Sequence, residues 1–315
     1  TIALVLLVTL RLMSSMSGTY GLQASLQGVK QGVSVLGIAN KEILVMAGTF
    51  ILEALHTSKT QLVPVDSEHS AIFQALMGNQ KSSVQSIILT GSGGPFRTRD
   101  KNTFHSIKKE EALKHPNWTM GAKITIDSAT MMNKGLEFIE AVRLFQLPPE
   151  KIKIVIHPES LVHSLVEYCD GSIMAQLGLS DMRIPIALAL SYPDRISVDL
   201  GKSLDLVEAG NLRFENPDFE KFPCLGLAMK AVSLSAEAPI VLNAANEIAV
   251  DRFLKDEIQF VEIPRLVEDS LEEFSSSSVK SLIDVVELDL SVKSWAKLWS
   301  ADYRRRGSFR ERLTL

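Results

Sequence analysis

The stretch "VPVDSEHSAIFQ", residues 63–74, decides the fold class because an apolar, β-branched run ends there in a polar, acidic turn. Short runs of this kind are typical of strands buried in a parallel sheet. Several more alternate with helical patterns, and this alternation predicts an α/β fold. The segments predicted to be strands are "VSVLGI" (33–38), "QLVPV" (61–65), "VQSIIL" (84–89), "KITI" (123–126), "IKIVI" (152–156) and "SIMAQL" (172–177).

The second half of the chain has a different texture. Residues 194–223 are rich in turn formers such as Gly201, Gly210 and Pro217, and they are predicted to be a linker. Over 224–300 apolar residues recur at helical spacing, which predicts a small helical bundle. The basic segment that follows, 301–315, is predicted to be a solvated tail.

Length, composition, net charge and cysteine count limit the classes of protein to which the chain can belong. With 315 residues, 46% hydrophobic and 22% charged, the chain can form two or three globular domains. A formal net charge of -4 gives no basic footprint for nucleic acid, so we expect no such partner. The 2 cysteines, Cys169 and Cys224, cannot build a disulfide framework and predict a reducing compartment.

The apolar opening "TIALVLLVTLRLM", residues 1–13, is not predicted to cross a membrane. It is well short of the roughly 20 apolar residues that a spanning helix needs, and Arg11 interrupts it. The flanks also differ from those of a signal peptide. Because the chain begins with Thr rather than Met, we interpret this segment as a fragment or an unusual start.

Two polar loops follow predicted strands, where ligands collect in open α/β sheets. Lys41 in "ANKE" (39–42) would reach an anionic substrate there, although a surface ion pair is the commoner use of such a lysine. Asp66 and Glu68 are spaced to leave the same side of an extended segment. Two converging carboxylates suit an oxygen-liking cation such as Mg²⁺ or Mn²⁺. A helix N-terminus, which also favours acids, is the alternative.

Two further stretches carry candidate chemistry. "ILTGSGGPF" (88–96) frees backbone N–H groups for a phosphate, although a tight turn explains its glycines almost as well. In "DSATMMNKGLEFIEA" (127–141) a cap-like Asp-Ser pair is predicted to begin a helix. Asn133, Lys134 and Glu137 would share one side of that helix. They form either a metal and hydroxyl site or an exposed Lys–Glu pair, and the apolar residues around them favour burial.

The remaining candidate site residues are two histidines and the tryptophan and methionine of one loop. "HPNWTMGAKI" (115–124) places Trp118 and Met120 in a loop, which predicts either a lid over the site or insertion into the core. His157 and His163 are more often packed or hydrogen-bonded histidines than ligands.

A series of stretches over residues 39–250 carries a resemblance to a known family: "ANKE", "VDSEH", "LTGSGGPF", "HPNWTMG", "DSATMMNKGLE", "IHPES", "QLGLSDMRIPIA" and "LNAANEIAV". In this order they closely resemble 1-deoxy-D-xylulose 5-phosphate reductoisomerases. The resemblance implies the C-terminal part of a Rossmann-like NADPH-binding domain, an α/β catalytic domain with a flap loop, and a C-terminal helical bundle. The expected segments are an NADPH-domain remnant (1–62), a catalytic domain (63–193), a linker (194–223), a helical domain (224–300) and a basic tail (301–315).

The resemblance also implies an activity. Such enzymes rearrange 1-deoxy-D-xylulose 5-phosphate and reduce the product with NADPH to 2-C-methyl-D-erythritol 4-phosphate, a step of the non-mevalonate isoprenoid pathway. We expect a homodimer without nucleic-acid or membrane partners, in a bacterial cytoplasm or a plastid-type organelle. The alternative is a non-catalytic, metal-dependent binder of sugar phosphates, which would consume no NADPH.

Residue roles follow from the same resemblance, position by position. The implied ligands of Mg²⁺ or Mn²⁺ are Asp66, Glu68 and Glu137. The implied substrate contacts are Lys41, Ser67, Glu68, Ser92, His115, Ser128, Asn133, Lys134 and Glu137, and those implied to be catalytic are Lys41, Glu68, His115, Lys134 and Glu137. Asn40, Glu42 and Gly121 are implied to lie against NADPH, with Trp118 and Met120 in the flap.

The chain departs from the family pattern at several points. No glycine-rich dinucleotide turn precedes "ANKE", so we expect only the final portion of the NADPH domain to be present. Ala122 stands in the flap where a basic residue is common in the family. The apolar opening and the Arg-rich tail are expected to lie outside the family pattern.

Overall fold

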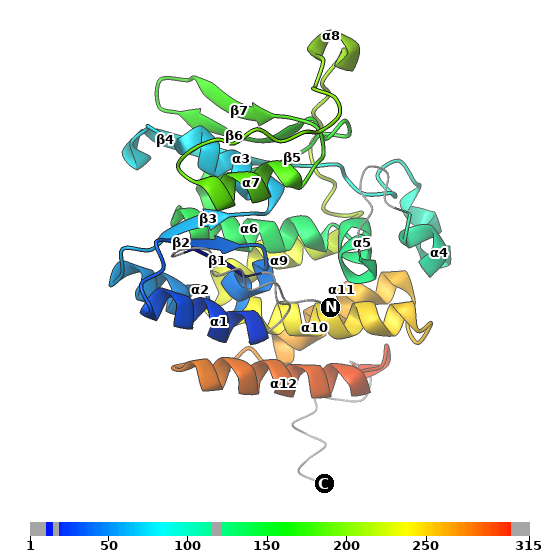
Figure 1. Cartoon of the computed structure of the whole chain (residues 1–315). Helices are drawn as coiled ribbons and strands as arrows, with labels where there is room; N and C mark the ends of the chain where they lie inside the picture. Colours follow the sequence, from blue (N-terminus) through cyan, green and yellow to red (C-terminus); the bar gives the residue numbers. More distant parts are fainter. Residues whose placement is uncertain (1–10, 15–18, 115–120, 304–315) are drawn as a thin grey trace. The chain divides into compact units, whose positions relative to one another are not determined.

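The computed structural model describes residues 11–14, 19–114 and 121–303. The chain forms two compact units, each built from two stretches of sequence (Figure 1). Unit 1 comprises residues 1–92 and 140–217, and unit 2 comprises residues 93–139 and 218–315. The boundary between residues 139 and 140 falls inside one continuous helix, α6 (Met132–Phe145).

The first sheet of unit 1 is parallel and has the strand order β1-β2-β3. Its strands are β1 (Arg11–Ser14), β2 (Val35–Ile38) and β3 (Gln61–Pro64), and the connecting helices are α1 (Thr19–Lys30) and α2 (Lys41–His56). Helix α7 (Arg183–Ser191) packs against β2 and β3. Val35, Val63 and Ala189 form the core of this contact, so the β-branched runs point into a packed interior.

Helix α2 is kinked at Ala47, whose φ of -132° and ψ of 26° are not helical. The Arg143 guanidinium of α6 fills the break, because its Nη1 donates to the carbonyl oxygens of Leu44 (2.6 Å) and Val45 (2.5 Å). Gly48 makes room, since a Cβ there would lie 2.6 Å from the Arg143 side chain. Burial lowers the pKa of Arg143 to about 10. The kink is therefore stabilised by a side chain inserted into the helix.

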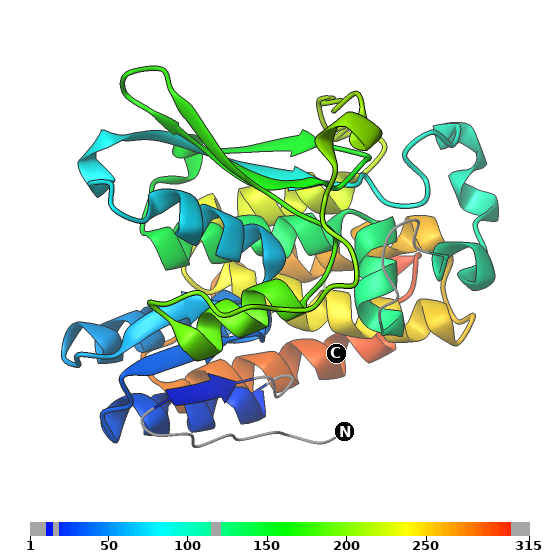
Figure 2. The same ribbon diagram turned by 45° about the horizontal axis from the view of Figure 1, so that its top comes forward.

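The second sheet of unit 1 is mixed and has the order β5-β4-β6-β7. Strands β4 and β5 are parallel, whereas β6 is antiparallel to both β4 and β7. The strands are β4 (Val84–Gly91), β5 (Ile152–Ile156), β6 (Val162–Tyr168) and β7 (Ile173–Leu177). Figure 2 shows α3 (Ser67–Leu76) running along one face of this sheet, where it contacts β6 and β7. At the open edge, β7 exposes most of its side chains.

Unit 2 is helical, and α10 (Ala238–Leu254) is its centre. This helix contacts α5, α9, α11 and α12, and it is buried on almost every side. The surrounding helices are α4 (Lys109–Ala112), α5 (Ala122–Ala129), α9 (Pro223–Leu234), α11 (Ile263–Glu273) and α12 (Leu282–Leu298). Because α10 is surrounded by other helices, its sequence is apolar all round rather than along a single stripe.

Short helices complete the described part of the chain. They are the 3-10 turns η1 (Lys81–Ser83), η2 (Lys101–Ser106), η3 (Pro149–Lys151) and η4 (Phe260–Glu262), and the single turn α8 (Leu206–Ala209). The turns η2 and η4 bring Phe104 and Phe260 together, with their ring centroids 5.9 Å apart. These rings belong to an aromatic cluster inside unit 2.

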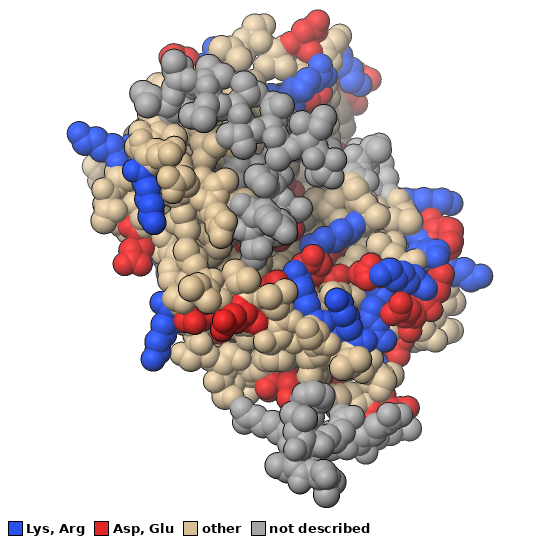
Figure 3. Space-filling model, turned by 60° about the horizontal axis from the view of Figure 1, so that its bottom comes forward, with Lys and Arg blue, Asp and Glu red and all other residues tan. Residues whose placement is uncertain are grey.

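Charged side chains of both signs are interspersed on the face shown in Figure 3. Among the ion pairs of the described residues, Lys293 lies 2.7 Å from Glu247 and 3.0 Å from Asp289. Neighbouring charges of opposite sign cancel at a distance, so the described residues of this face carry no broad field of one sign. None of the described helices is both long enough and apolar enough to cross a membrane.

The α/β fold class is confirmed, but some predicted elements are wrong. The "KITI" segment, 123–126, belongs to helix α5, where Ile126 is buried against the helical unit; tertiary packing overrides its β propensity. Asp127 and Ser128 do not begin a helix but end α5, and α6 starts only after Met131, which has a φ of 62°. Strands β1 and β6 were not predicted at all.

Candidate functional site

Asp66 stands in unit 1 at the N-cap position of α3, two residues after the end of strand β3. Its side chain makes no capping hydrogen bond to that helix. Instead its Oδ2 lies 2.7 Å from the Lys41 Nζ at the start of α2, and the lysine is also buried. Although Asp66 occupies a helix N-terminus, its carboxylate is directed at a cation, as expected for a functional carboxylate.

The extended geometry expected for Asp66 and Glu68 is wrong, because Ser67 already begins helix α3. Glu68 lies in the first turn of the helix, where the dipole favours a carboxylate. The Ser67 hydroxyl donates to Glu68 Oε2 at 2.5 Å, which orients that carboxylate. Nearby in unit 1, Asn40 caps α2 by accepting a hydrogen bond from the Glu42 backbone N–H at 3.0 Å.

Two opposing effects act on the pKa of Asp66. Burial alone would raise it, but the Lys41 ammonium and the His69 ring outweigh that effect and hold the pKa of Asp66 well below its usual range. The carboxylate therefore stays ionised although its side chain is only 14% exposed. A buried anion held in this way is ready to meet a cation without first losing a proton.

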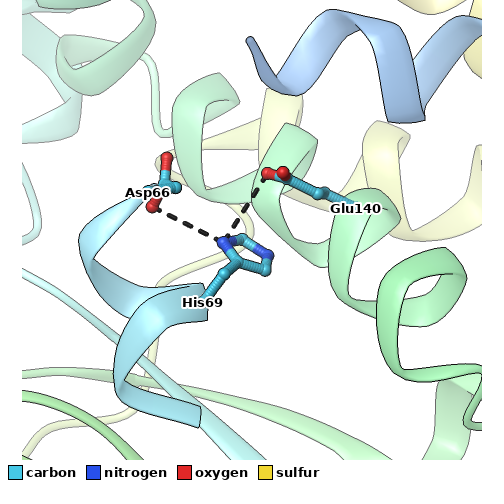
Figure 4. Close-up of side chains that lie close together, drawn as sticks. All are labelled: Asp66, His69 and Glu140. Atoms are coloured by element: carbon cyan, nitrogen blue, oxygen red, sulfur yellow. Dashed lines mark ion pairs between the residues drawn. The ribbon is translucent and has the colours of Figure 1, made fainter. Parts of the chain in front are cut away.

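His69 and Glu140 extend this cluster (Figure 4). The His69 Nδ1 lies 3.5 Å from Asp66 Oδ1 and 3.6 Å from Glu140 Oε2, and all these atoms fall within 4.8 Å of one another. The ring is fully buried and stacks on Phe145, with centroids 6.1 Å apart and an interplanar angle of 7°. We call Asp66, His69 and Glu140 the histidine cluster. Neither His69 nor Glu140 was predicted from the sequence to be a site residue.

The glycine turn after β4 is shaped by a close backbone approach. Gly93 and Gly94 have φ values of 83° and 69°, which favour glycine. In unit 2, a Cβ on Gly94 would lie only 2.5 Å from the Ser128 carbonyl oxygen at the end of α5. The turn therefore needs glycine at residue 94 for packing as well as for its dihedral angle, and Ser92 immediately precedes it.

The first turns of α6 carry the predicted Asn-Lys-Glu cluster in unit 2. Asn133 Nδ2 donates to Glu137 Oε1 at 2.6 Å, and the Lys134 ammonium pairs with the other carboxylate oxygen. Lys134 is 5% exposed and Glu137 is 1% exposed, so the alternative of an exposed Lys–Glu pair is wrong. Gly135 permits this close packing, because a Cβ added at this position would lie only 2.5 Å from the Ala228 side chain of α9.

The end of α5 is anchored from the helical core. Asp127 is buried and accepts hydrogen bonds from Asn246 Nδ2 (2.7 Å) and Lys123 Nζ (2.9 Å). This contact holds the following residue, Ser128, at the end of the helix. Gly121 occupies the N-cap position of α5.

Several predicted residues fall elsewhere. His115, Trp118 and Met120 lie outside the described residues. His157 is a buried, hydrogen-bonded histidine, as predicted: its Nδ1 lies 2.8 Å from the Arg213 carbonyl oxygen. Unit 1 holds Asn40, Lys41, Glu42, Asp66, Ser67, Glu68 and Ser92, whereas unit 2 holds Gly121, Ser128, Asn133, Lys134 and Glu137.

Family models match most of the chain. The 1-deoxy-D-xylulose 5-phosphate reductoisomerase model matches residues 7–48, its C-terminal domain model residues 62–145, and a further DXP reductoisomerase C-terminal domain model residues 177–295. A 1-deoxy-D-xylulose 5-phosphate reductoisomerase of Acetivibrio thermocellus is 52% identical over 262 residues, which are 83% of this chain and 68% of the relative. The chain belongs to the 1-deoxy-D-xylulose 5-phosphate reductoisomerase family.

Other reductoisomerases agree. The enzyme of Caldanaerobacter subterraneus is 50% identical over 279 residues, covering 89% of this chain and 73% of the relative. A reductoisomerase from Zymomonas mobilis, solved in complex with NADPH, matches with a TM-score of 0.86 and 45% identity over 91% of this chain and 74% of its own. A DOX-P reductoisomerase solved with NADPH, fosmidomycin and magnesium matches with a TM-score of 0.85 and 41% identity, at the same coverage.

One expectation about the family pattern is corrected by these matches. The apolar opening was expected to lie outside the reductoisomerase pattern, but the family model begins at residue 7. Residues 11–14 form strand β1, which pairs in parallel with β2. Within this strand the Leu12 side chain is buried, as is typical of a parallel sheet.

Proposed function

We propose that this reductoisomerase rearranges 1-deoxy-D-xylulose 5-phosphate and reduces the product with NADPH to 2-C-methyl-D-erythritol 4-phosphate. The observation that carries the proposal is the set of cation-paired carboxylates, the partly exposed Asp66 with Lys41 and the buried Glu137 with Lys134, within the segments that the family models match. Solved relatives with NADPH and with magnesium support both cofactors. The compartment, a bacterial cytoplasm or a plastid-type organelle, stays a prediction.

We assign the metal to Asp66, Glu68 and Glu137. Their carboxylate oxygens are the donors that Mg²⁺ and Mn²⁺ prefer, and Asp66 is already held as an anion. Glu137 precedes Glu140 by three positions on α6, so both side chains project from one side of the helix. A bound ion would polarise the carbonyl and hydroxyl oxygens of the substrate.

The remaining polar residues are proposed to hold the substrate. Ser92, Ser128, Asn133, Lys134 and His115 would bind its phosphate and hydroxyl groups, and Ser67 would contact it from α3. The glycine turn supports this assignment, because the positive φ values of Gly93 and Gly94 are typical of turns where a ligand approaches the backbone closely. Trp118 and Met120 are proposed to form the flap that excludes water.

The two buried ammonium groups are proposed to counter negative charge on the reacting oxygens. Lys41 and Lys134 are each fixed by a carboxylate, so neither lysine must be ordered when the substrate binds. Charge that develops on a substrate oxygen in such a buried site is stabilised far more than it would be in water. Asn40, Glu42 and Gly121 are proposed to lie against NADPH.

Glu137→Gln tests the assignment. We expect turnover, followed as DXP-dependent loss of NADPH absorbance with Mn²⁺, to fall by at least about 100-fold, because a metal ion contributes several kcal/mol of transition-state stabilisation. Glu150→Gln, an exposed change in unit 1, is the matched control and should keep full activity. An active Glu137→Gln enzyme would refute the metal assignment. Substrate binding without NADPH consumption by the wild-type chain would favour a sugar-phosphate binder.

We also propose that two copies of the chain pair through the open edge of the second sheet. Strand β7 is an edge strand and presents Ile173 (53% exposed), Met174 (46%) and Leu177 (36%). Ile173→Lys should shift the mass measured by light scattering from dimer to monomer. Ile196→Lys, at a position that is 56% exposed in a loop, should leave the dimer intact. Equal effects of both changes would rule out this edge.

A further inference from the structure

Unit 2 contains a pocket of about 570 Å³ whose lining includes none of the proposed catalytic residues. Its walls are the first turns of α9 and α11, together with η2 and η4. Ser128, Asn133, Lys134 and Glu137 do not line it. The volume lies within the range of about 300–1,000 Å³ that is typical of small-molecule sites.

The floor of the pocket is aromatic. Phe104, Phe222 and Phe260 are buried, and the Phe104 ring centroid lies 5.9 Å from the centroid of each of the other two rings. Cys224 also lines the pocket, and burial raises the pKa of its thiol to about 12, so this side chain is neutral. Such a floor favours an apolar, planar group in van der Waals contact.

The rim carries an excess of positive charge. Lys101 is balanced by Glu220 at 3.3 Å, and Lys221 is engaged by the Arg97 carbonyl oxygen at 2.8 Å and by the Phe104 ring. Lys230 and Arg265 line the pocket without a hydrogen bond or ion pair to any described residue.

Two further features bear on the charge of the rim. The pocket also has a second carboxylate, Glu268, which lies on the same helix as Arg265. The N-termini of α9 and α11 add partial positive charge. The lining therefore remains positive on balance.

We propose that this pocket binds a small amphipathic organic anion. Its flat apolar body would pack on the phenylalanine floor. Lys230 and Arg265 would form ion pairs with its single carboxylate, sulfonate or phosphate group. An inorganic anion alone would make no apolar contact with the phenylalanine floor. A neutral compound of the same shape would leave both cations without a partner.

Calorimetry on the full chain with naphthoate tests the proposal. We expect saturable binding of one molecule per chain, and at least about tenfold weaker binding of naphthamide, which has the same rings without the charge. Inorganic phosphate alone should not bind at the pocket. Absence of naphthoate binding, or equal affinity for the amide, would overturn the proposal.

Variants locate the binding. Lys230→Glu and Arg265→Glu should each weaken naphthoate binding by about tenfold. Lys297→Glu, an exposed charge reversal on α12 outside the pocket lining, should not. If Lys297→Glu weakens binding as much as the rim variants, binding reflects net charge and the assignment fails.

Gly226→Leu fills the pocket without a backbone clash. Gly226 lines the pocket, and an added Cβ would meet Phe219 at 3.8 Å, an ordinary contact. Leucine also favours a helix more than glycine does, so the melting temperature should not fall. We expect naphthoate binding to disappear in this folded variant, and retention of wild-type affinity would contradict the site.

Discussion

The histidine cluster of unit 1 and the pocket of unit 2 handle charge in opposite ways. In the first, the Asp66 carboxylate is only 14% exposed and has a buried cation 2.7 Å away, and the His69 ring lies between two carboxylates. In the second, aromatic rings are buried, while Lys230 and Arg265 stay at the rim without a partner among the described residues. Burying a charge is costly unless it is paired, so the cluster is built for ionic chemistry and the pocket for an apolar body.

This difference sets what each region tolerates. Removing one member of a buried pair leaves an uncompensated charge, which typically costs about 3–5 kcal/mol. Exposed charges at a rim contribute about 0–1 kcal/mol to stability, so changes there should affect binding and little else. The variants below test the comparison, beginning with the largest expected effect.

Asp66→Asn should have the largest effect. It keeps the shape of the side chain but leaves the buried Lys41 ammonium without its counter-ion at 2.7 Å. We expect the free energy of unfolding to fall by about 3–5 kcal/mol and turnover to be lost. Urea denaturation and the NADPH assay measure the two effects.

The control for this change is Asp194→Asn, at an exposed position of unit 1. Both quantities should stay at their wild-type values in that variant. An Asp66→Asn protein of unchanged stability would mean that the buried pair is not maintained in solution.

Glu140→Gln should have a smaller and more selective effect. Glu140 does not belong to the proposed metal ligands, but it lies 3.6 Å from the His69 ring, which in turn lies 3.5 Å from Asp66. Partners that orient a ligand typically contribute about 10–100-fold to metal affinity. We therefore expect a higher Mn²⁺ concentration at half-maximal activity, with kcat at saturating metal changed less.

A double-mutant cycle separates positioning from general damage. If Glu140 acts through the ring, Glu140→Gln and His69→Gln together should weaken Mn²⁺ binding by no more than the stronger single change. Fully additive effects would show that the two residues affect Mn²⁺ binding independently. The histidine cluster would then not act as a unit.

The sequence was informative wherever local pattern and burial agree. The β-branched runs at 35–38, 61–64, 84–91 and 152–156 are strands because they are buried in sheets, as the period and composition predicted. The same reasoning failed at 123–126, where isoleucine packs from a helix instead. The "VHSLVEY" strand was not recognised, because polar residues interrupt its apolar pattern.

The residues of the candidate site show the same contrast between local sequence pattern and tertiary packing. Asp66, Lys134 and Glu137 were identified because their residue types and spacing, and the family resemblance, point to them. The partnership of His69 with Glu140 was not, because it depends on the packing of α3 against α6, far apart in sequence. The position of Glu140 one turn after Glu137 was the only available signal.

The two cysteines give the smallest test of the comparison. Cys169 is exposed in unit 1, whereas Cys224 is buried in the pocket floor with its pKa raised from 9.0 to about 12 by burial and by the charge of Asp127. Because the thiolate is the nucleophile, iodoacetamide at neutral pH should modify Cys169 alone, as judged by mass spectrometry. Modification of both would place Cys224 in contact with solvent.

The raised pKa of Cys224 also predicts an alkaline limit to stability. Below pH 9.0 the thiol is protonated in both the folded and the unfolded chain, so its contribution to stability is fully present. Between pH 9.0 and about 12 only the unfolded chain loses the proton, so the free energy of unfolding falls, by at most about 1.4 kcal/mol per pH unit from this group. Cys224→Ala removes this contribution, and its urea-unfolding free energy should decline less steeply with pH over that window. Equal slopes for the two proteins would show that the thiol is not held neutral by its aromatic surroundings.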